Sequence, residues 1–225
     1  MIRLPALKTR YDLFVFDLDG TLLDSRADIA AAANATLVAF GVTPLTEASV
    51  VNLVGAGVHQ LIDDLFATAT GESPTSDTHD AAYHFFMRTY GENCTTHTVF
   101  YPGVTACLEK IGDKKLAVLT NKPESFSLDI LAALACGTTF YPVIGGDHPA
   151  GKKPAPEGLR LIMATHGIAP ERTLMLGDSP IDVATAKAAG CESLVFLSGF
   201  GREIDLRNAA PTWILQDFHD LVACL

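Results

Sequence analysis

Residues 12–21 read Asp-Leu-Phe-Val-Phe-Asp-Leu-Asp-Gly-Thr, an apolar run that ends abruptly in two acidic side chains, Asp17 and Asp19. Short runs rich in β-branched and aromatic residues are typical of strands buried on both faces of a parallel sheet. Such runs predict six strands, at 12–16, 116–120, 142–145, 173–176, 193–197 and 212–215. Predicted helices alternate with most of them, at 104–111, 125–134, 157–166 and 181–189. This alternation predicts an α/β fold with a parallel sheet covered by helices on both faces.

One connection breaks the alternation. About a hundred residues separate the first two predicted strands, far more than a crossover helix requires. Helical patterns fill this segment at 25–40, 47–53, 58–68 and 77–90, and Ser25 and Asp28 have the spacing of a capping box. The turn Tyr101-Pro102-Gly103 marks the return to the sheet. We therefore expect a catalytic core made of residues 1–24 and 99–225, with a helical domain of residues 25–98 inserted into it.

Composition narrows the class of protein. The chain of 225 residues carries 16 basic and 26 acidic residues, a formal net charge of -10. Such a balance argues against a nucleic-acid partner, because binding nucleic acid depends largely on Lys and Arg. The five cysteines are scattered and lack the spacing of a zinc site, which favours reduced thiols in the cytoplasm. No apolar run is long enough to predict a membrane helix, so we expect a soluble protein.

Polar segments follow several of the predicted strands, at the edge where open parallel sheets bind their ligands. These segments are 17–21 (Asp-Leu-Asp-Gly-Thr), 120–122 (Thr-Asn-Lys), 152–156 (Lys-Lys-Pro-Ala-Pro) and 177–182 (Gly-Asp-Ser-Pro-Ile-Asp). If they converge, four carboxyl groups, a hydroxyl and a lysine meet at one place. That set of groups suits phosphoryl transfer, in which catalysis is chiefly positioning and charge stabilisation.

The acidic side chains divide into three expected roles. Asp17 can attack phosphorus as a nucleophile, and Asp19 can protonate the leaving oxygen and later deprotonate water. Magnesium prefers oxygen ligands, so Asp17, the backbone carbonyl of Asp19 and Asp178 are the expected metal ligands. Asp182 is open to two interpretations: a residue of the first helical turn stabilised by the helix dipole, or part of the magnesium site.

The other candidates would bind the phosphoryl group. Thr120 and the backbone around Asn121 can hydrogen-bond its oxygens. Lys153 supplies a positive charge for Asp17 and for the transition state, whereas we expect the neighbouring Lys152 to be a surface residue.

Taken together, the four polar segments resemble the four motifs of the haloacid dehalogenase superfamily, in the same order and spacing. The inserted helical segment is similar to the C1 cap of that family. The resemblance implies a Rossmann-like core, an aspartate nucleophile, Mg²⁺ as cofactor and a phosphatase activity. Segments 54–57, 101–104, 186–191 and 199–205 resemble the phosphoglycolate phosphatase-like branch in particular.

Within the expected cap, the resemblance favours a loop at Gly55 and Gly57 that faces the substrate, over the alternative that the two glycines simply permit a tight turn. His59 is more typical of a surface residue than of a ligand. We expect Asp24 and Ser25 to start a helix and form a hinge rather than to act in catalysis.

Several alternatives stay open at this level. A phosphomutase would use the same nucleophile and pass the phosphoryl group to a sugar. A phospho-receiver signalling module also combines an aspartate, magnesium, a threonine and a lysine. The partner is expected to be a small phosphorylated metabolite, with phosphoglycolate, a sugar phosphate, a nucleotide and pyrophosphate as candidates, and the protein to be a monomer or homodimer.

Overall fold

A computed structural model describes residues 7–225, so the first six residues of the expected core lie outside the described residues. Its central sheet has six strands in the order β5-β4-β1-β6-β7-β8, all paired in parallel. The strands are β1 (Leu13–Phe16), β4 (Lys115–Leu119), β5 (Val143–Ile144), β6 (Thr173–Gly177), β7 (Glu192–Phe196) and β8 (Trp213–Leu215). The predicted α/β fold with a parallel, Rossmann-like sheet is confirmed.

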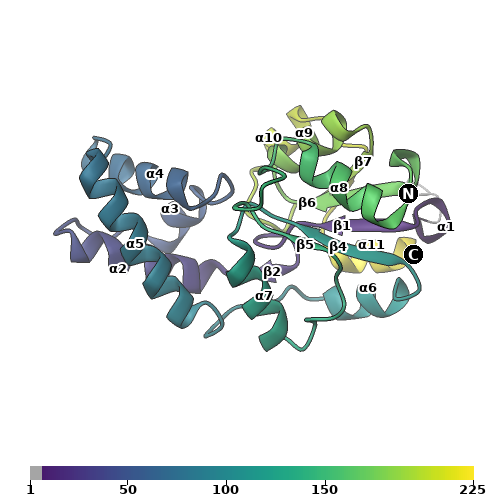
Figure 1. Cartoon of the computed structure of the whole chain (residues 1–225), viewed down its shortest axis with the longest axis horizontal. Coiled ribbons are helices and arrows are strands. Elements are labelled where there is room, and N and C mark those ends of the chain that lie inside the picture. The colour runs from purple at the N-terminus through teal and green to yellow at the C-terminus, as the bar shows by residue number, and fades with distance from the viewer. Residues whose placement is uncertain (1–6) are drawn as a thin grey trace.

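Alternate side chains of each strand point to opposite faces of the sheet. In β1, Phe14 and Phe16 belong to one buried cluster, while Leu13 and Val15 belong to another. The first cluster packs against α1 (Leu7–Arg10), α6 (Val104–Lys110), α7 (Glu124–Ala133) and α11 (Phe218–Cys224). The second packs against α8 (Glu157–His166) and α9 (Pro180–Ala189), and α10 (Glu203–Asn208) follows β7. Figure 1 shows these helices on the two sides of the sheet.

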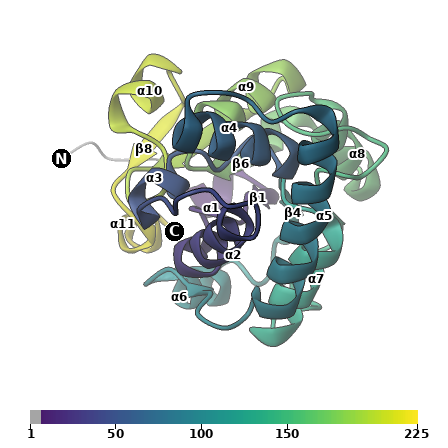
Figure 2. The ribbon, with the colours of Figure 1, turned by 90° about the vertical axis from the view of Figure 1, so that its left-hand side faces the viewer.

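Four further helices lie beyond one end of the sheet: α2 (Arg26–Ala39), α3 (Glu47–Val51), α4 (Val58–Thr70) and α5 (Ser76–Asn93). They form the left-hand part of the molecule in Figure 1 and stand in front of the sheet in Figure 2. The chain enters them through β2 (Leu23–Asp24) and leaves them through β3 (Val99–Phe100), and these two strands form an antiparallel pair. The insertion therefore begins and ends at one place.

The expected capping box at Ser25 and Asp28 is wrong. Ser25 occupies the N-cap position of α2, but its hydroxyl donates to Oδ1 of Asp19 at 2.7 Å instead of capping the helix. The buried carboxylate of Asp28 accepts from the backbone N–H groups of His97 and Thr98, at 3.0 and 2.9 Å. A buried carboxylate needs such donors, and the returning chain supplies more of them than the helix start could.

No helix within residues 7–225 combines the length and apolar character that crossing a membrane would require. The five cysteines are all unpaired.

Candidate active site

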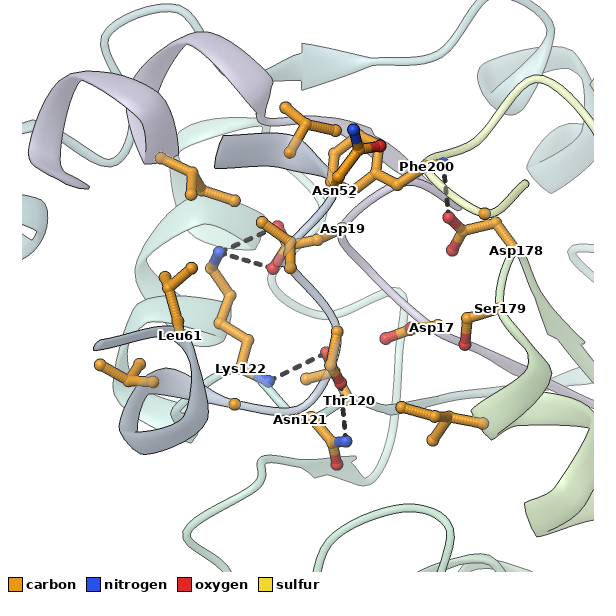
Figure 3. Close-up of a pocket in the computed structure, with 18 of the residues that line it drawn as sticks. Asp17, Asp19, Asn52, Leu61, Thr120, Asn121, Lys122, Asp178, Ser179 and Phe200 are labelled. Atoms are coloured by element: carbon orange, nitrogen blue, oxygen red, sulfur yellow. Dashed lines mark hydrogen bonds and ion pairs between the residues drawn. The ribbon is translucent and has the colours of Figure 1, made fainter. Parts of the chain in front are cut away.

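A pocket of about 480 Å³ lies between the sheet and the inserted helices. Its floor, as we call the part at the carboxyl ends of the strands, is formed by Asp17, Asp19, Thr120, Lys122 and Asp178. Its roof is an apolar surface of the inserted helices and their connections, formed by Ile29, Val51, Val54, Leu61 and Phe86. Figure 3 shows the floor residues converging from three separate segments of the chain. The convergence expected from the sequence is thus present.

Asp17 stands at the end of β1 with its carboxylate facing the pocket. The ammonium of Lys153 lies 2.7 Å from its Oδ2, and its Oδ1 accepts the N–H of Leu18 at 2.7 Å. Burial raises the pKa of Asp17 to about 6, against the attraction of Lys153 and a hydrogen bond from Thr120. The neighbouring lysine thus favours the ionised form that a nucleophile requires.

Asp178 follows β6 and approaches Asp17 from the adjacent strand. Thr21 donates its hydroxyl to one carboxylate oxygen at 2.8 Å, and the N–H of Phe200 donates to the other at 2.7 Å. Burial, followed by the nearby carboxylates of Asp182 and Asp17, raises the pKa of Asp178 to about 8. The carboxyl groups of Asp17, which is partly buried, and of Asp178 and Asp182, which are buried, have oxygens within 4.8 Å of one another, an arrangement that a cation stabilises.

The close approach of these strand ends depends on Gly20. Its φ of +79° belongs to the left-handed region, and a Cβ atom at this position would lie 2.2 Å from Oδ2 of Asp178. Glycine both adopts this backbone conformation and leaves the space that the carboxylate occupies.

Asp182 has both carboxylate oxygens engaged. Oδ1 accepts from Lys153 at 2.6 Å, and Oδ2 accepts from the N–H and hydroxyl of Ser179 at 3.0 and 2.6 Å. The second contact is part of a true capping box at the start of α9. The interpretation of Asp182 as a residue of the first helical turn is therefore confirmed, and its contact with Lys153 is additional; its part in a magnesium site stays a prediction. Of the three carboxyl groups, Asp17 and Asp178 line the pocket and Asp182 does not.

Lys153 is almost completely buried between two carboxylates. Burial by itself disfavours the ammonium form, but Asp17 and Asp182 outweigh it and raise the pKa of Lys153 to about 12. The lysine therefore stays charged at any physiological pH. Its immediate neighbour Lys152 is exposed, as expected, and donates to the carbonyl of Ala56 at 2.9 Å.

The position of Asp19 is set by a lysine that the sequence did not single out. Lys122 donates to both carboxylate oxygens of Asp19 at 2.9 Å and to the hydroxyl of Tyr90 at 2.7 Å. The buried ammonium has a raised pKa, because Asp19 and Tyr90 outweigh the cost of burial. The sequence feature that could have indicated Lys122 is its position directly after Thr120 and Asn121 at the end of a predicted strand.

Of the residues predicted to bind the phosphoryl group, Thr120 and Asn121 line the pocket, whereas Lys153 lies behind the pocket lining and contacts Asp17. Thr120 hydrogen-bonds Asp17, and its oxygen accepts the N–H of Lys122 at 3.2 Å. The side-chain amide of Asn121 instead donates to the carbonyls of Gly55 and Lys153, at 2.9 and 3.0 Å. The Asn121 side chain thus joins the core to the glycine loop of the inserted helices.

Gly55 and Gly57 both line the pocket, so their loop does face it. Gly57 has a φ of +84° and lies against the carbonyl of Asn121, which a Cβ atom would approach to 3.4 Å. His59, the second residue of α4, is exposed and stacks on the ring of Tyr83 with 4.1 Å between ring centroids. It does not line the pocket, in agreement with the expectation of a surface residue.

Comparisons with known proteins agree with this geometry. A model of the family described as haloacid dehalogenase-like hydrolase matches residues 14–196. Phosphoglycolate phosphatase 1 of Pseudomonas aeruginosa is 36% identical, with 98% of this chain and 82% of that protein aligned. A phosphoglycolate phosphatase of Rhodospirillum rubrum is 38% identical, with 92% and 88% aligned.

A solved structure extends the agreement to three dimensions. The crystal structure of a predicted phosphoglycolate phosphatase from Haemophilus somnus superposes with a TM-score of 0.89 at 30% identity, covering 95% of this chain and 97% of that one. The family model covers most of the chain, and the two relatives align over more than four fifths of their lengths. The resemblance seen in the four polar segments is confirmed, and the chain belongs to the haloacid dehalogenase-like hydrolase family.

Proposed function

We propose that this phosphatase of the haloacid dehalogenase type hydrolyses small phosphate monoesters with Mg²⁺, through a phosphoryl group carried transiently by Asp17. The observation that supports this most strongly is the position of the Lys153 ammonium, 2.7 Å from the Asp17 carboxylate and beside the cluster that contains Asp178. A nucleophile, a fixed cation and a place for a divalent ion thus surround one point at the bottom of the pocket.

In the first step, a carboxylate oxygen of Asp17 attacks phosphorus and the bond from phosphorus to the ester oxygen breaks. Asp19 gives a proton to that oxygen, so the product leaves as a neutral alcohol. Lys153, Thr120 and the backbone N–H of Asn121 stabilise the charge on the transferring phosphoryl oxygens. In the second step Asp19 takes a proton from water, and the resulting attack on phosphorus frees phosphate and Asp17.

The donor set fits a magnesium ion. Asp17 and Asp178 offer carboxylate oxygens, and the backbone carbonyl of Asp19 completes the protein ligands that we propose. Asp182 acts on this site through Lys153 and α9, because its carboxylate contacts both of them and, unlike Asp17 and Asp178, does not line the pocket. When bound, the ion supplies positive charge that offsets the repulsion between the Asp17 carboxylate and the phosphate dianion.

We propose that residues 25–98 are a cap domain that covers the reacting group and selects the leaving group. The roof presents aliphatic and aromatic side chains to the pocket, and the glycine loop closes against Asn121. A roof of this kind excludes water from the transfer step and contacts the part of the substrate beyond the phosphate. Phosphoglycolate is the first substrate to test, because the relatives at 36–38% identity carry that name.

The decisive experiment is a rapid acid quench of the enzyme during turnover of a labelled phosphate monoester with Mg²⁺. We expect label on the wild-type protein that hydroxylamine releases, as an acyl phosphate requires, and none on Asp17→Asn. Turnover without any trapped acyl phosphate would contradict the mechanism. Discharge of the label to an added sugar rather than to water would favour a phosphomutase, and a label stable for minutes would favour a phospho-receiver module.

Substrate choice is tested by measuring kcat/KM over phosphoglycolate, sugar phosphates, nucleotides and pyrophosphate. Variants of the roof should change the order of these substrates. A profile indifferent to roof substitutions would contradict the proposed role of the cap.

A further inference from the structure

We propose that Lys122 and Tyr90 are positioning residues that hold the acid–base Asp19 toward the leaving group, and that the inserted helices complete the acid by supplying Tyr90. This inference rests on the proposed function, in which Asp19 protonates the ester oxygen. It assigns roles to two residues that are neither among the four aspartates of the site nor among the residues proposed to bind the phosphoryl group.

The first support is the pattern of contacts on Asp19. Its Oδ1 accepts from the hydroxyl of Ser25 at 2.7 Å and from Lys122 at 2.9 Å, whereas among residues 7–225 Oδ2 accepts only from Lys122, at 2.9 Å. One oxygen is therefore fixed by two donors, and the other keeps capacity for a further hydrogen bond. Since Asp19 lines the pocket, Oδ2 is the oxygen suited to exchange a proton with the substrate.

The second support is how tightly Lys122 itself is held. Its ammonium is buried and lies over the ring of Tyr90, 4.6 Å from the ring centroid, while donating to the Tyr90 hydroxyl at 2.7 Å. Tyr90 is 2% exposed and packs between the rings of Phe86 and Phe126, at centroid distances of 5.5 and 5.2 Å. A long, flexible lysine side chain thus has one defined position, and so does the carboxylate that it holds.

The third support is the origin of these residues. Asp19 follows β1 and Lys122 follows β4, and both of these strands belong to the central sheet. Tyr90 belongs to α5 of the insertion. The last contact in the series therefore crosses from the sheet to the inserted helices. The acid is fully held only when α5 lies over the strand ends, so that proton transfer is linked to closure of the pocket around a substrate.

The dependence of activity on the leaving group separates positioning of an acid from mere structural support. An alkyl phosphate needs a proton on its leaving oxygen, because an alkoxide is a strong base, whereas p-nitrophenolate leaves as a stable anion. The parameter to compare is kcat/KM, which reports the steps up to transfer onto Asp17 and is independent of the later hydrolysis.

For Tyr90→Phe we expect kcat/KM to fall about 5-fold on ethyl phosphate and by less than about 2-fold on p-nitrophenyl phosphate, because a slightly misplaced acid penalises only the first. For Lys122→Gln we expect kcat/KM to fall about 10²-fold on ethyl phosphate and less than about 10-fold on p-nitrophenyl phosphate. The matched controls are Tyr83→Phe, on the same helix but outside the pocket, and Lys115→Gln, exposed at the start of β4. Neither control should alter the ratio of kcat/KM for ethyl phosphate to kcat/KM for p-nitrophenyl phosphate.

Equal losses on both substrates in both variants would overturn the proposal, since a residue that only supports the fold or only binds phosphate affects them alike. The thermal unfolding of each variant is measured in parallel. If Lys122→Gln is too unstable to assay, Tyr90→Phe decides the question, because it removes a single hydroxyl. A wild-type enzyme that hydrolyses neither substrate contradicts the proposed function instead, so the two failures are distinguishable.

Discussion

The floor and the roof of the pocket are built in opposite ways. The floor consists of charged and polar groups, and Asp17, Asp178 and Lys122 each have named partners at hydrogen-bonding distance. The roof is a set of apolar side chains such as Leu61 and Phe86, held by packing. Groups fixed by directional bonds have one arrangement, whereas an apolar surface accepts any ligand of suitable shape. In the proposed function, the floor therefore determines which reaction occurs, and the roof determines which molecule undergoes it.

The largest test of the floor is loss of the nucleophile. Asp17→Asn keeps the size of the side chain but removes the attacking carboxylate, so we expect kcat to fall by roughly 10⁴-fold or more. Turnover of p-nitrophenyl phosphate measures the loss. Asp12→Asn is the control, because Asp12 stands at the other end of the same strand and pairs with Arg172 away from the pocket. Substantial activity in Asp17→Asn would mean that the floor does not work as a nucleophilic site.

Removal of the positive charge of the buried Lys153 side chain tests how far the floor depends on charge balance. Lys153→Met leaves the carboxylates of Asp17 and Asp182 without their shared partner, and we expect about 3–5 kcal/mol of lost stability, besides a severe loss of activity. Chemical denaturation measures the free energy of unfolding. The neighbouring Lys152→Met should change it by about 0.5 kcal/mol or less, since Lys152 is exposed. Similar losses in the two variants would contradict the difference that we draw between these lysines.

The floor should also respond to pH and to magnesium together. The folded protein raises the carboxyl pKa values of Asp17 to about 6 and of Asp178 to about 8, from an ordinary value of 3.8. Folding then favours the protonated groups, so the stability that they contribute is present at low pH and is lost as the pH rises through the folded pKa values. In EDTA we therefore expect the Tm to fall between pH 5 and pH 8.

Magnesium should reverse that fall, because it binds the ionised carboxylates. At a concentration of 100 times its Kd it would stabilise the protein by about 2.7 kcal/mol at pH 8, and by much less at pH 5, where protons compete. Differential scanning calorimetry at both pH values measures this. Asp178→Asn is the matched variant, in which the difference between the stabilisation by magnesium at pH 8 and at pH 5 should shrink. Equal stabilisation at the two pH values would count against a carboxylate metal site.

The smallest expected effect concerns the roof. Leu61→Ala removes apolar surface from the pocket, and we expect kcat/KM for a phosphate ester with a bulky apolar leaving group to fall about 5- to 10-fold, with little change for acetyl phosphate. Leu65→Ala is the control, because Leu65 is equally buried on α4 but does not line the pocket. A uniform effect on all substrates would show that the roof does not select the leaving group.

The difference between floor and roof also explains what the sequence could reveal. Parallel strands bring their carboxyl ends to one edge, so Asp17, Thr120 and Asp178 could be placed together from strand patterns alone. The bond between Lys122 and Tyr90 could not, because it depends on where α5 lies over the sheet. For the same reason the sequence places Asp28 correctly in the first turn of a helix but not its partners, His97 and Thr98, which lie 69 and 70 residues later in the chain. Local patterns fix local structure, and contacts between the sheet and the insertion require the tertiary arrangement.

The paired strands β2 and β3 have a consequence for how such a protein can change. The chain departs from the sheet and returns to it through hydrogen-bonded neighbours, and Asp28 ties the outgoing helix to Thr98 on the return. The chain between these two strands is therefore connected covalently to the core through this one pair of strands. A segment of different length or shape can be joined to the same two strands without breaking the pairing of β2 with β3, but it must again supply the contacts that Ser25 and Tyr90 make with Asp19 and Lys122. Exchange of this one continuous stretch would therefore change the roof of the pocket and the position of Asp19 together.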